Sequence, residues 1–285
     1  MTPTSKRWTQ FAASLLALAP LSGADNHKRE IKEIFSSADE TVQFIELFDT
    51  DKDEHILIET SISTASGSFF AFPSNLPSTQ TENRHVLLAT AAFAAIPGAP
   101  TPDYIIPAGF LRRTGDTVTY AATPHSVSFG PLPTDGQKSI NAAGVMATNS
   151  PTNFAGQTGS VILATAVVRN GANVNPLCYA SLPPKLGKPW SATVDASNHP
   201  GAIGVVLSGF ALPASGPNFP AGQLLMDLAS RRYFQLTRAV SGGRAVFNGQ
   251  MPVNLALLGR TMATQPLIYG GNLEFCNAVD MKVGW

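Results

Sequence analysis

The sequence predicts an all-β protein built from two β-sandwich domains, and three observations support this prediction. The chain has 285 residues, which is more than one hydrophobic core usually serves. Glycine (24) and proline (22) are frequent while charged residues make up only 13%, as in proteins made of short strands and turns. Valine, isoleucine, threonine and phenylalanine recur in short runs between these turn residues, as strands require.

The first 24 residues are expected to form a secretory signal peptide. Lys6 and Arg7 precede an apolar stretch, residues 11–21, that is too short to span a bilayer. Small residues then place the cleavage after Ala24, and Asp25 stands where a lipoprotein would need cysteine. The mature protein is therefore expected to be secreted to the periplasm or the cell exterior. The alternative is an amphipathic helix retained in a cytoplasmic protein, which the proline and glycine in this segment disfavour.

The charge balance bears on the partners. Removing the signal leaves 17 basic and 19 acidic residues, so the mature chain is nearly neutral. Binding of nucleic acid depends on clustered lysine and arginine, and we therefore expect no nucleic-acid partner. The pairs Arg112-Arg113 and Arg231-Arg232 are isolated and are expected in solvated turns. No second apolar run reaches the about 18 residues of a membrane span, so no membrane span is expected either.

The first domain is expected to contain seven strands and one helical turn. In the strand that ends at Phe48, apolar residues occupy both faces, which favours a strand inside a sandwich over one with a wet face. Glycine, proline, asparagine and aspartate separate it from the others. The expected strands are 31–35, 41–48, 56–62, 68–72, 84–90, 116–120 and 125–129, with a helical turn at 91–95. Residues 135–160 are poor in large aliphatic side chains and are expected to form an ordered loop and then a linker.

Part of this pattern resembles a known family. The segments Val42 to Phe48, Arg84 to Thr90 and Gly115 to Thr119, followed by Ser126 to Gly130, resemble a lamin-tail-type domain of exported bacterial proteins. The resemblance implies an immunoglobulin-like sandwich over residues 27–158. It departs from the family in one respect, since no Leu-x-Gly-Trp strand follows Ile58.

The second domain, residues 159–285, is expected to be a separate β-sandwich. Its expected strands are 161–169, 190–194, 203–210, 223–228, 233–238, 244–247, 261–269 and 273–283. The segments Asn170 to Pro176, Gly259 to Ile268 and Asn277 to Asp280 resemble a C-terminal β-domain that recurs in secreted bacterial proteins. That resemblance implies an architecture and an extracellular address, and no activity.

The two cysteines, Cys178 and Cys276, both lie in the second domain. An even number of cysteines in an exported protein favours a disulfide, here one that closes a loop of about 100 residues. Two buried free thiols are the alternative, because the sequence does not place the two Cα atoms within bridging distance. Neither cysteine is expected to be catalytic.

The densest polar cluster runs from Asp49 to His55. Asp49, Asp51 and Asp53 alternate as at the start of a calcium-binding loop, so calcium is the candidate cofactor. Glu54 stands where such a loop turns sharply at glycine, and Thr60 stands where it needs a bidentate glutamate. A solvated hairpin tip is the alternative interpretation.

No catalytic residue is predicted. The five histidines show neither the helical spacing nor the strand spacing of a metal site, and no nucleophile elbow or phosphate-binding loop occurs. Aromatic residues such as Trp190 and Tyr233 are expected mainly in the core. The sequence thus predicts a secreted, non-enzymatic binding or structural protein that contacts a protein or glycan surface. Two alternatives stay open: an extracellular hydrolase with a site at the domain junction, and a calcium-stabilised adhesive module.

Overall fold

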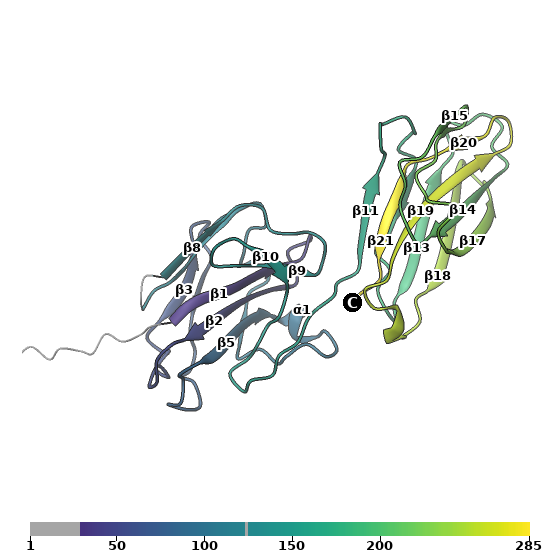
Figure 1. Ribbon diagram of the computed structural model, residues 1–285. Helices are drawn as coiled ribbons and strands as arrows, with labels where there is room; N and C mark the ends of the chain where they lie inside the picture. The colour runs from purple at the N-terminus through teal and green to yellow at the C-terminus, as the bar shows by residue number, and fades with distance from the viewer. Residues whose placement is uncertain (1–28, 123–124) are drawn as a thin grey trace, which may run out of the picture.

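The computed structural model describes residues 29–122 and 125–285, and the expected signal peptide lies outside them. Within these residues the protein is nearly all β, as predicted, with one short α-helix and one 3-10 turn. The strands from 29–148 pair among themselves, and so do the strands from 165–282 (Figure 1). Two β-sandwiches result. No helix in the described part of the chain has the length and apolar character needed to cross a membrane.

The first sandwich packs a six-stranded sheet, in the order β10-β9-β1-β2-β5-β6, against a four-stranded sheet, β4-β3-β7-β8. Neighbouring strands are antiparallel except β5 and β6, which are parallel. Its elements are β1 (Arg29–Ser36), β2 (Gln43–Asp49), β3 (Ser61–Thr64), β4 (Phe69–Ala71), β5 (Arg84–Thr90), α1 (Ala91–Ala94), β6 (Tyr104–Ile106), β7 (Asp116–Tyr120), β8 (His125–Phe129), β9 (Lys138–Asn141) and β10 (Met146–Thr148).

Strand β2 is buried on both faces, as the sequence predicts. Ile45 and Leu47 face the core between the two sheets. Phe44 faces the other way and stacks on Phe35, with the ring of Phe93 from α1 packed edge-on against it. This second apolar cluster also takes in side chains from residues 161–163. The outer face of the first sheet is therefore covered where the chain passes to the second sandwich.

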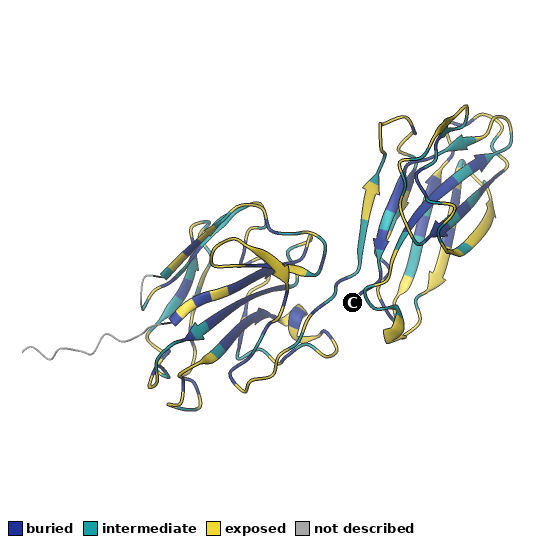
Figure 2. Ribbon diagram, in the orientation of Figure 1, coloured by how far each residue is buried: buried dark blue, intermediate teal, exposed yellow. Residues whose placement is uncertain are grey.

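The second sandwich packs the sheet β11-β21-β19-β14-β17 against the sheet β12-β13-β18, and β20 adds to β19. Residues of both sheets that are buried, dark blue in Figure 2, form its core. Its elements are β11 (Thr165–Arg169), β12 (Tyr179–Ser181), β13 (Pro189–Asp195), β14 (Gly204–Phe210), β15 (Asn218–Phe219), β16 (Gly222–Gln223), β17 (Arg232–Ala239), β18 (Arg244–Gln250), the 3-10 turn η1 (Leu255–Leu257), β19 (Thr261–Tyr269), β20 (Glu274–Phe275) and β21 (Ala278–Lys282).

Several expected elements differ from the structure in the first sandwich. Residues 56–60 are not strand, because the side chain of Asn75 accepts the backbone N–H groups of Leu57 and Ile58 and holds this segment as a loop. The expected loop 135–160 contains β9 and β10. The rest of that segment is also anchored, since the buried carboxylate of Glu33 accepts the N–H of Ser150 and that of Glu46 accepts the N–H of Thr152.

Three expected strands of the second sandwich are shorter than predicted or interrupted. Of the expected strand 161–169, only Thr165–Arg169, β11, is strand. Of the expected strand 223–228, only Gln223 is strand, at the end of β16, because side chains take the later backbone groups: Gln265 accepts the N–H of Leu225, and Arg169 donates to its carbonyl. The segment 273–283 is interrupted between β20 and β21, where Asn175 and Gln265 donate to the carbonyl of Cys276.

Candidate functional site

The predicted calcium loop does not gather its three aspartates around a common site. Asp49 ends β2, fully buried, and both of its carboxylate oxygens accept hydrogen bonds from the guanidinium of Arg29, Nε at 2.5 Å and Nη2 at 2.8 Å. Arg29 also donates to the hydroxyl of Tyr120 and to the carbonyl of Glu54. The Asp49 carboxylate is thus fully buried and paired on both oxygens with a buried cation, and it does not open onto the loop as a calcium ligand would.

The rest of this loop is held by main-chain contacts. The hydroxyl of Thr81 donates to the carbonyl of Asp51 and accepts the N–H of Glu54. Asp53 has a positive φ of 67°, and its N–H donates to the carbonyl of Thr79. Within the described ranges, no three histidine, cysteine or acidic side chains form a group that could hold a metal ion. The structure therefore does not bring these three aspartates together, and their role as calcium ligands stays a prediction.

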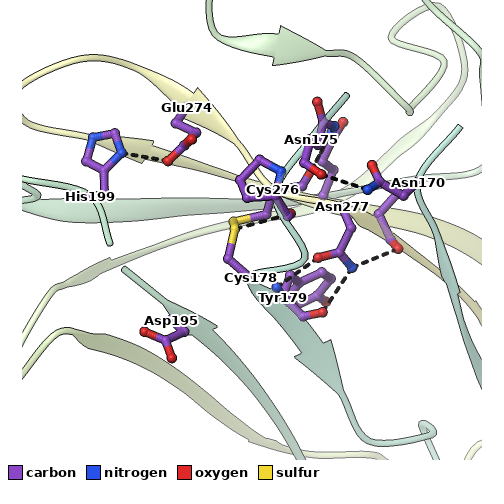
Figure 3. Close-up of a disulfide and its surroundings, with 12 residues drawn as sticks. Asn170, Asn175, Cys178, Tyr179, Asp195, His199, Glu274, Cys276 and Asn277 are labelled. Atoms are coloured by element: carbon purple, nitrogen blue, oxygen red, sulfur yellow. Dashed lines mark hydrogen bonds and ion pairs between the residues drawn. A yellow bond between two sulfur atoms is a disulfide. The ribbon is translucent and has the colours of Figure 1, made fainter. Parts of the chain in front are cut away.

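Two histidines pair with carboxylates. Nδ1 of His85 lies 2.8 Å from Oε1 of Glu46 in the first sandwich. In the second, Nδ1 of His199 lies 2.8 Å from Oε2 of Glu274 (Figure 3), and Nε2 lies 3.2 Å from the carbonyl of Gly270. Both ring nitrogens of His199 thus face acceptors, so neither is available to take a proton from a nucleophile or water. The His199 pair stabilises the end of the sandwich and does not form a catalytic dyad.

The His199 pair predicts a pH-dependent stability. The hydrogen bond to Glu274 raises the pKa of His199 above its ordinary value of 6.5, despite burial, which alone would lower it. The folded state therefore binds this proton more tightly than the unfolded state, and the stabilisation is present below pH 6.5 and lost as pH rises through the raised pKa. We expect the denaturation midpoint of the second sandwich to fall over that range, and the midpoint of H199Q to change less. An equal pH profile for the two proteins would contradict this assignment, and H55Q in the first sandwich is the control.

The predicted disulfide is present. Cys178 precedes β12 and Cys276 lies between β20 and β21, with their Cα atoms 5.5 Å apart, so the bond joins the two sheets of the second sandwich (Figure 3). Beside it, the side chain of Asn277 accepts the N–H of Tyr179 and donates to its carbonyl, both at 2.9 Å. A covalent bond and a pair of hydrogen bonds thus close the same end of this sandwich.

A groove of about 640 Å³ lies between the two sandwiches. The first sandwich supplies the β1–β2 turn, the end of α1, and Arg113; the second supplies the start of β11, the segment before β13, and the end of the chain. Most lining side chains are apolar or small. They include Val42, Ala92, Ala95, Ile96, Leu163, Ala164, Ala166, Val167, Pro183 and Trp285.

Backbone bonds fix the floor of this groove. Trp285 donates its N–H to the carbonyl of Ile162 and accepts the N–H of Ala164, and Leu163 donates to the carbonyl of Gly136. Gly284 makes the close approach possible, because a Cβ there would lie 2.3 Å from the backbone of Leu163 and Ala164. Leu163 and the partly buried Trp285 pack in the apolar cluster around Phe44 and Phe93.

The charged side chains at the rim are two cations and one carboxylate. Nε of Arg113 is buried and has no hydrogen-bond partner in the described structure. Lys185 is exposed at the rim. Burial alone would raise the pKa of Asp39, but hydrogen bonds from Ser37 and Thr41 and the charge of Lys185 together lower it. Because the Asp39 carboxylate is already occupied by those donors, positive charge is what the groove offers to a ligand.

No pattern in the sequence predicts this groove. Its lining comes from segments spread from residue 37 to residue 285, and the one early signal was Arg112-Arg113, which the sequence placed in a solvated turn. No protein-family model matches this chain, and a search of curated proteins found no significant match. The lamin-tail resemblance of residues 27–158 and the domain boundary near residue 159 stay predictions.

Proposed function

We propose that this protein is a secreted, non-enzymatic binding protein of the bacterial cell exterior whose ligand sits in the groove between its two sandwiches. The observation that supports this most is Arg113, a residue that lines the groove and whose buried Nε has no hydrogen-bond partner in the described structure. An unpaired buried donor is costly, and a bound acceptor would remove that cost. The disulfide of the second sandwich supports an oxidising location.

The chemistry of the lining defines the ligand class. Apolar side chains cover most of the wall, and Trp285 offers a flat aromatic surface. Arg113 of the first sandwich and Lys185 of the second supply positive charge. A small molecule with an apolar body and one carboxylate or similar anion fits both features, since burial of the body and a charge-assisted hydrogen bond to the head group act together. The proposed ligand is therefore an amphiphilic anion.

Dodecanoate is a suitable probe, and filling the groove should abolish its binding. We expect dodecanoate to change the fluorescence of Trp285 with saturation. Ala95 lines the groove and Ala94 does not, although both are exposed residues at the end of α1. The variant A95W should therefore lose binding measured by calorimetry, while A94W should bind as the native protein does. Equal binding by A95W and A94W would place dodecanoate elsewhere.

A second pair of variants, R113Q and R112Q, tests whether binding of dodecanoate requires the positive charge of Arg113. R113Q should weaken dodecanoate binding by about tenfold, the effect of losing one charge-assisted hydrogen bond. R112Q changes the neighbouring arginine, which is exposed and outside the groove, and should leave the affinity unchanged. Dodecanol, which lacks the anion, should bind no more tightly to the native protein than to R113Q.

A further inference from the structure

A long segment of the second sandwich carries positive charge alone. Residues 228–273 contain Arg231, Arg232, Arg238, Arg244 and Arg260 and no aspartate or glutamate, in a chain whose basic and acidic residues are equal in number. Four of these arginines lie on β17, on the residue before it, or at the start of β18. None of the four is within ion-pair distance of a carboxylate among the described residues. Asp195 is paired in register with Arg244 across β13 and β18.

Strand β17 is also an open edge. It pairs with β14 on one side and ends its sheet on the other. Seven of its eight residues are exposed, and Figure 2 shows it as an exposed strand at the margin of the second sandwich. The carbonyl of Thr237 accepts a long hydrogen bond, 3.3 Å, from the guanidinium of Arg238, so this carbonyl faces away from β14. Outward-facing N–H and C=O groups of this kind can accept another strand.

The side chains along this edge add binding surface to its main-chain groups. Tyr233 lies in the β-bulge of the strand with the Arg231 guanidinium 5.7 Å from its ring, and Tyr233 and Leu236 are each 37% exposed. Phe234 packs inward against Trp190 and holds the strand on the sandwich. Strand β17 is thus packed against the sandwich on one side and presents both apolar and positively charged side chains to solvent.

We infer that β17 is a docking edge for an acidic, extended polypeptide segment of another protein, which adds to the sheet as a strand. The main-chain groups would supply affinity independent of sequence, and the arginines would select glutamate and aspartate side chains. This inference goes beyond the proposed ligand groove, because β11, which lines the groove, is at the opposite margin of the same sheet.

Charge argues for this occupant over a second copy of the chain. Pairing two β17 strands would bring Arg231, Arg232 and Arg238 of one copy against those of the other, and like charges opposite each other destabilise a strand pair. The open row of main-chain groups distinguishes an acidic peptide from an acidic glycan, because a glycan would need the arginines and make no strand hydrogen bonds.

The test uses a labelled eight-residue peptide, the length of β17, that alternates glutamate with valine and threonine. Fluorescence anisotropy with the native protein should show saturable binding that weakens as salt is added. The same peptide with lysine in place of glutamate should not bind. The triple variant R231Q/R232Q/R238Q should bind the acidic peptide at least about tenfold more weakly, because three exposed ion pairs are removed.

A second pair of variants tests the strand itself. T237P removes an outward N–H from an edge strand, where proline is tolerated, and T237V keeps that N–H with a similar side chain. T237P should lose peptide binding and T237V should keep it. Hydrogen exchange of the native protein should slow at residues 232–239 when the peptide is bound. Dodecanoate binding should be unchanged in all of these variants, so failure of this proposal is separable from failure of the groove.

Three outcomes would overturn the inference. They are equal binding of the acidic peptide by the native protein and the arginine triple variant, equal binding by T237P and T237V, and no binding at all. Tighter binding of heparin than of the peptide, with no protection of residues 232–239, would instead assign the arginines to a glycan.

Discussion

The D49N variant is expected to lose about 3 to 5 kcal/mol of unfolding free energy, the cost of leaving a buried charge without its partner. Arg29 is 1% exposed and Asp49 is 0% exposed, so water cannot replace the lost carboxylate. Asparagine keeps the size of the side chain and removes the charge, which leaves the guanidinium of Arg29 uncompensated in the core of the first sandwich. Chemical denaturation of the first sandwich measures the change.

Asp53 offers the matched control for this variant. D53N makes the same chemical change four residues later, at an exposed position with a positive φ that asparagine adopts readily. Its stability should be close to that of the native protein. The double variant R29M/D49L removes both charges and should recover much of the loss caused by D49N. Equal stability of D49N and D53N would refute the role assigned to the Arg29–Asp49 pair.

Removing the disulfide is expected to cost about 2 to 5 kcal/mol in the second sandwich. Cys178 and Cys276 are 98 residues apart, and a cross-link across a loop of this length strongly restricts the unfolded chain. The double variant C178A/C276A should therefore unfold at lower denaturant than the native protein. The first sandwich lies outside the closed loop, and its transition should keep its midpoint.

Reductant supplies the control for the disulfide variant. It should lower the midpoint of the native second sandwich towards that of C178A/C276A and leave the variant unchanged. Thiol titration accompanies this measurement, because it shows whether the disulfide has been reduced. If no free thiols form, an unchanged midpoint means only that the reductant cannot reach the bond. A fully reduced protein of unchanged stability would contradict the prediction.

The sequence predicted the elements that local patterns determine. β5 and β8 have the predicted bounds, and the all-β class and the cysteine pairing are confirmed. The strands it missed are short and depend on a partner: β6 has three residues and exists as a strand because it lies parallel to β5. β9 and β10 lie in a segment poor in large aliphatic residues, so no apolar alternation marked them.

Contacts between residues far apart in the sequence explain why local patterns did not predict the roles of Asp49, of Arg231-Arg232 and of the groove residues. Asp49, Asp51 and Asp53 have the spacing of calcium ligands, but the partner that decides the role of Asp49 is Arg29, twenty residues earlier. Arg231-Arg232 were expected in a turn, yet Arg232 begins β17, because the strand pairs with β14 over residues 232–239. The groove is assembled from both halves of the chain, and no local spacing encodes such a surface.

The position of β21 determines when the second sandwich can be completed. It pairs with β11 on one side and β19 on the other, yet it is translated after every other strand described. All strands of the first sandwich precede β11, so that sandwich can fold while the second still lacks a central strand and Cys276. A chain that ends before residue 276 would leave the edges of β11 and β19 without their partner strand, and such edges can pair with other chains.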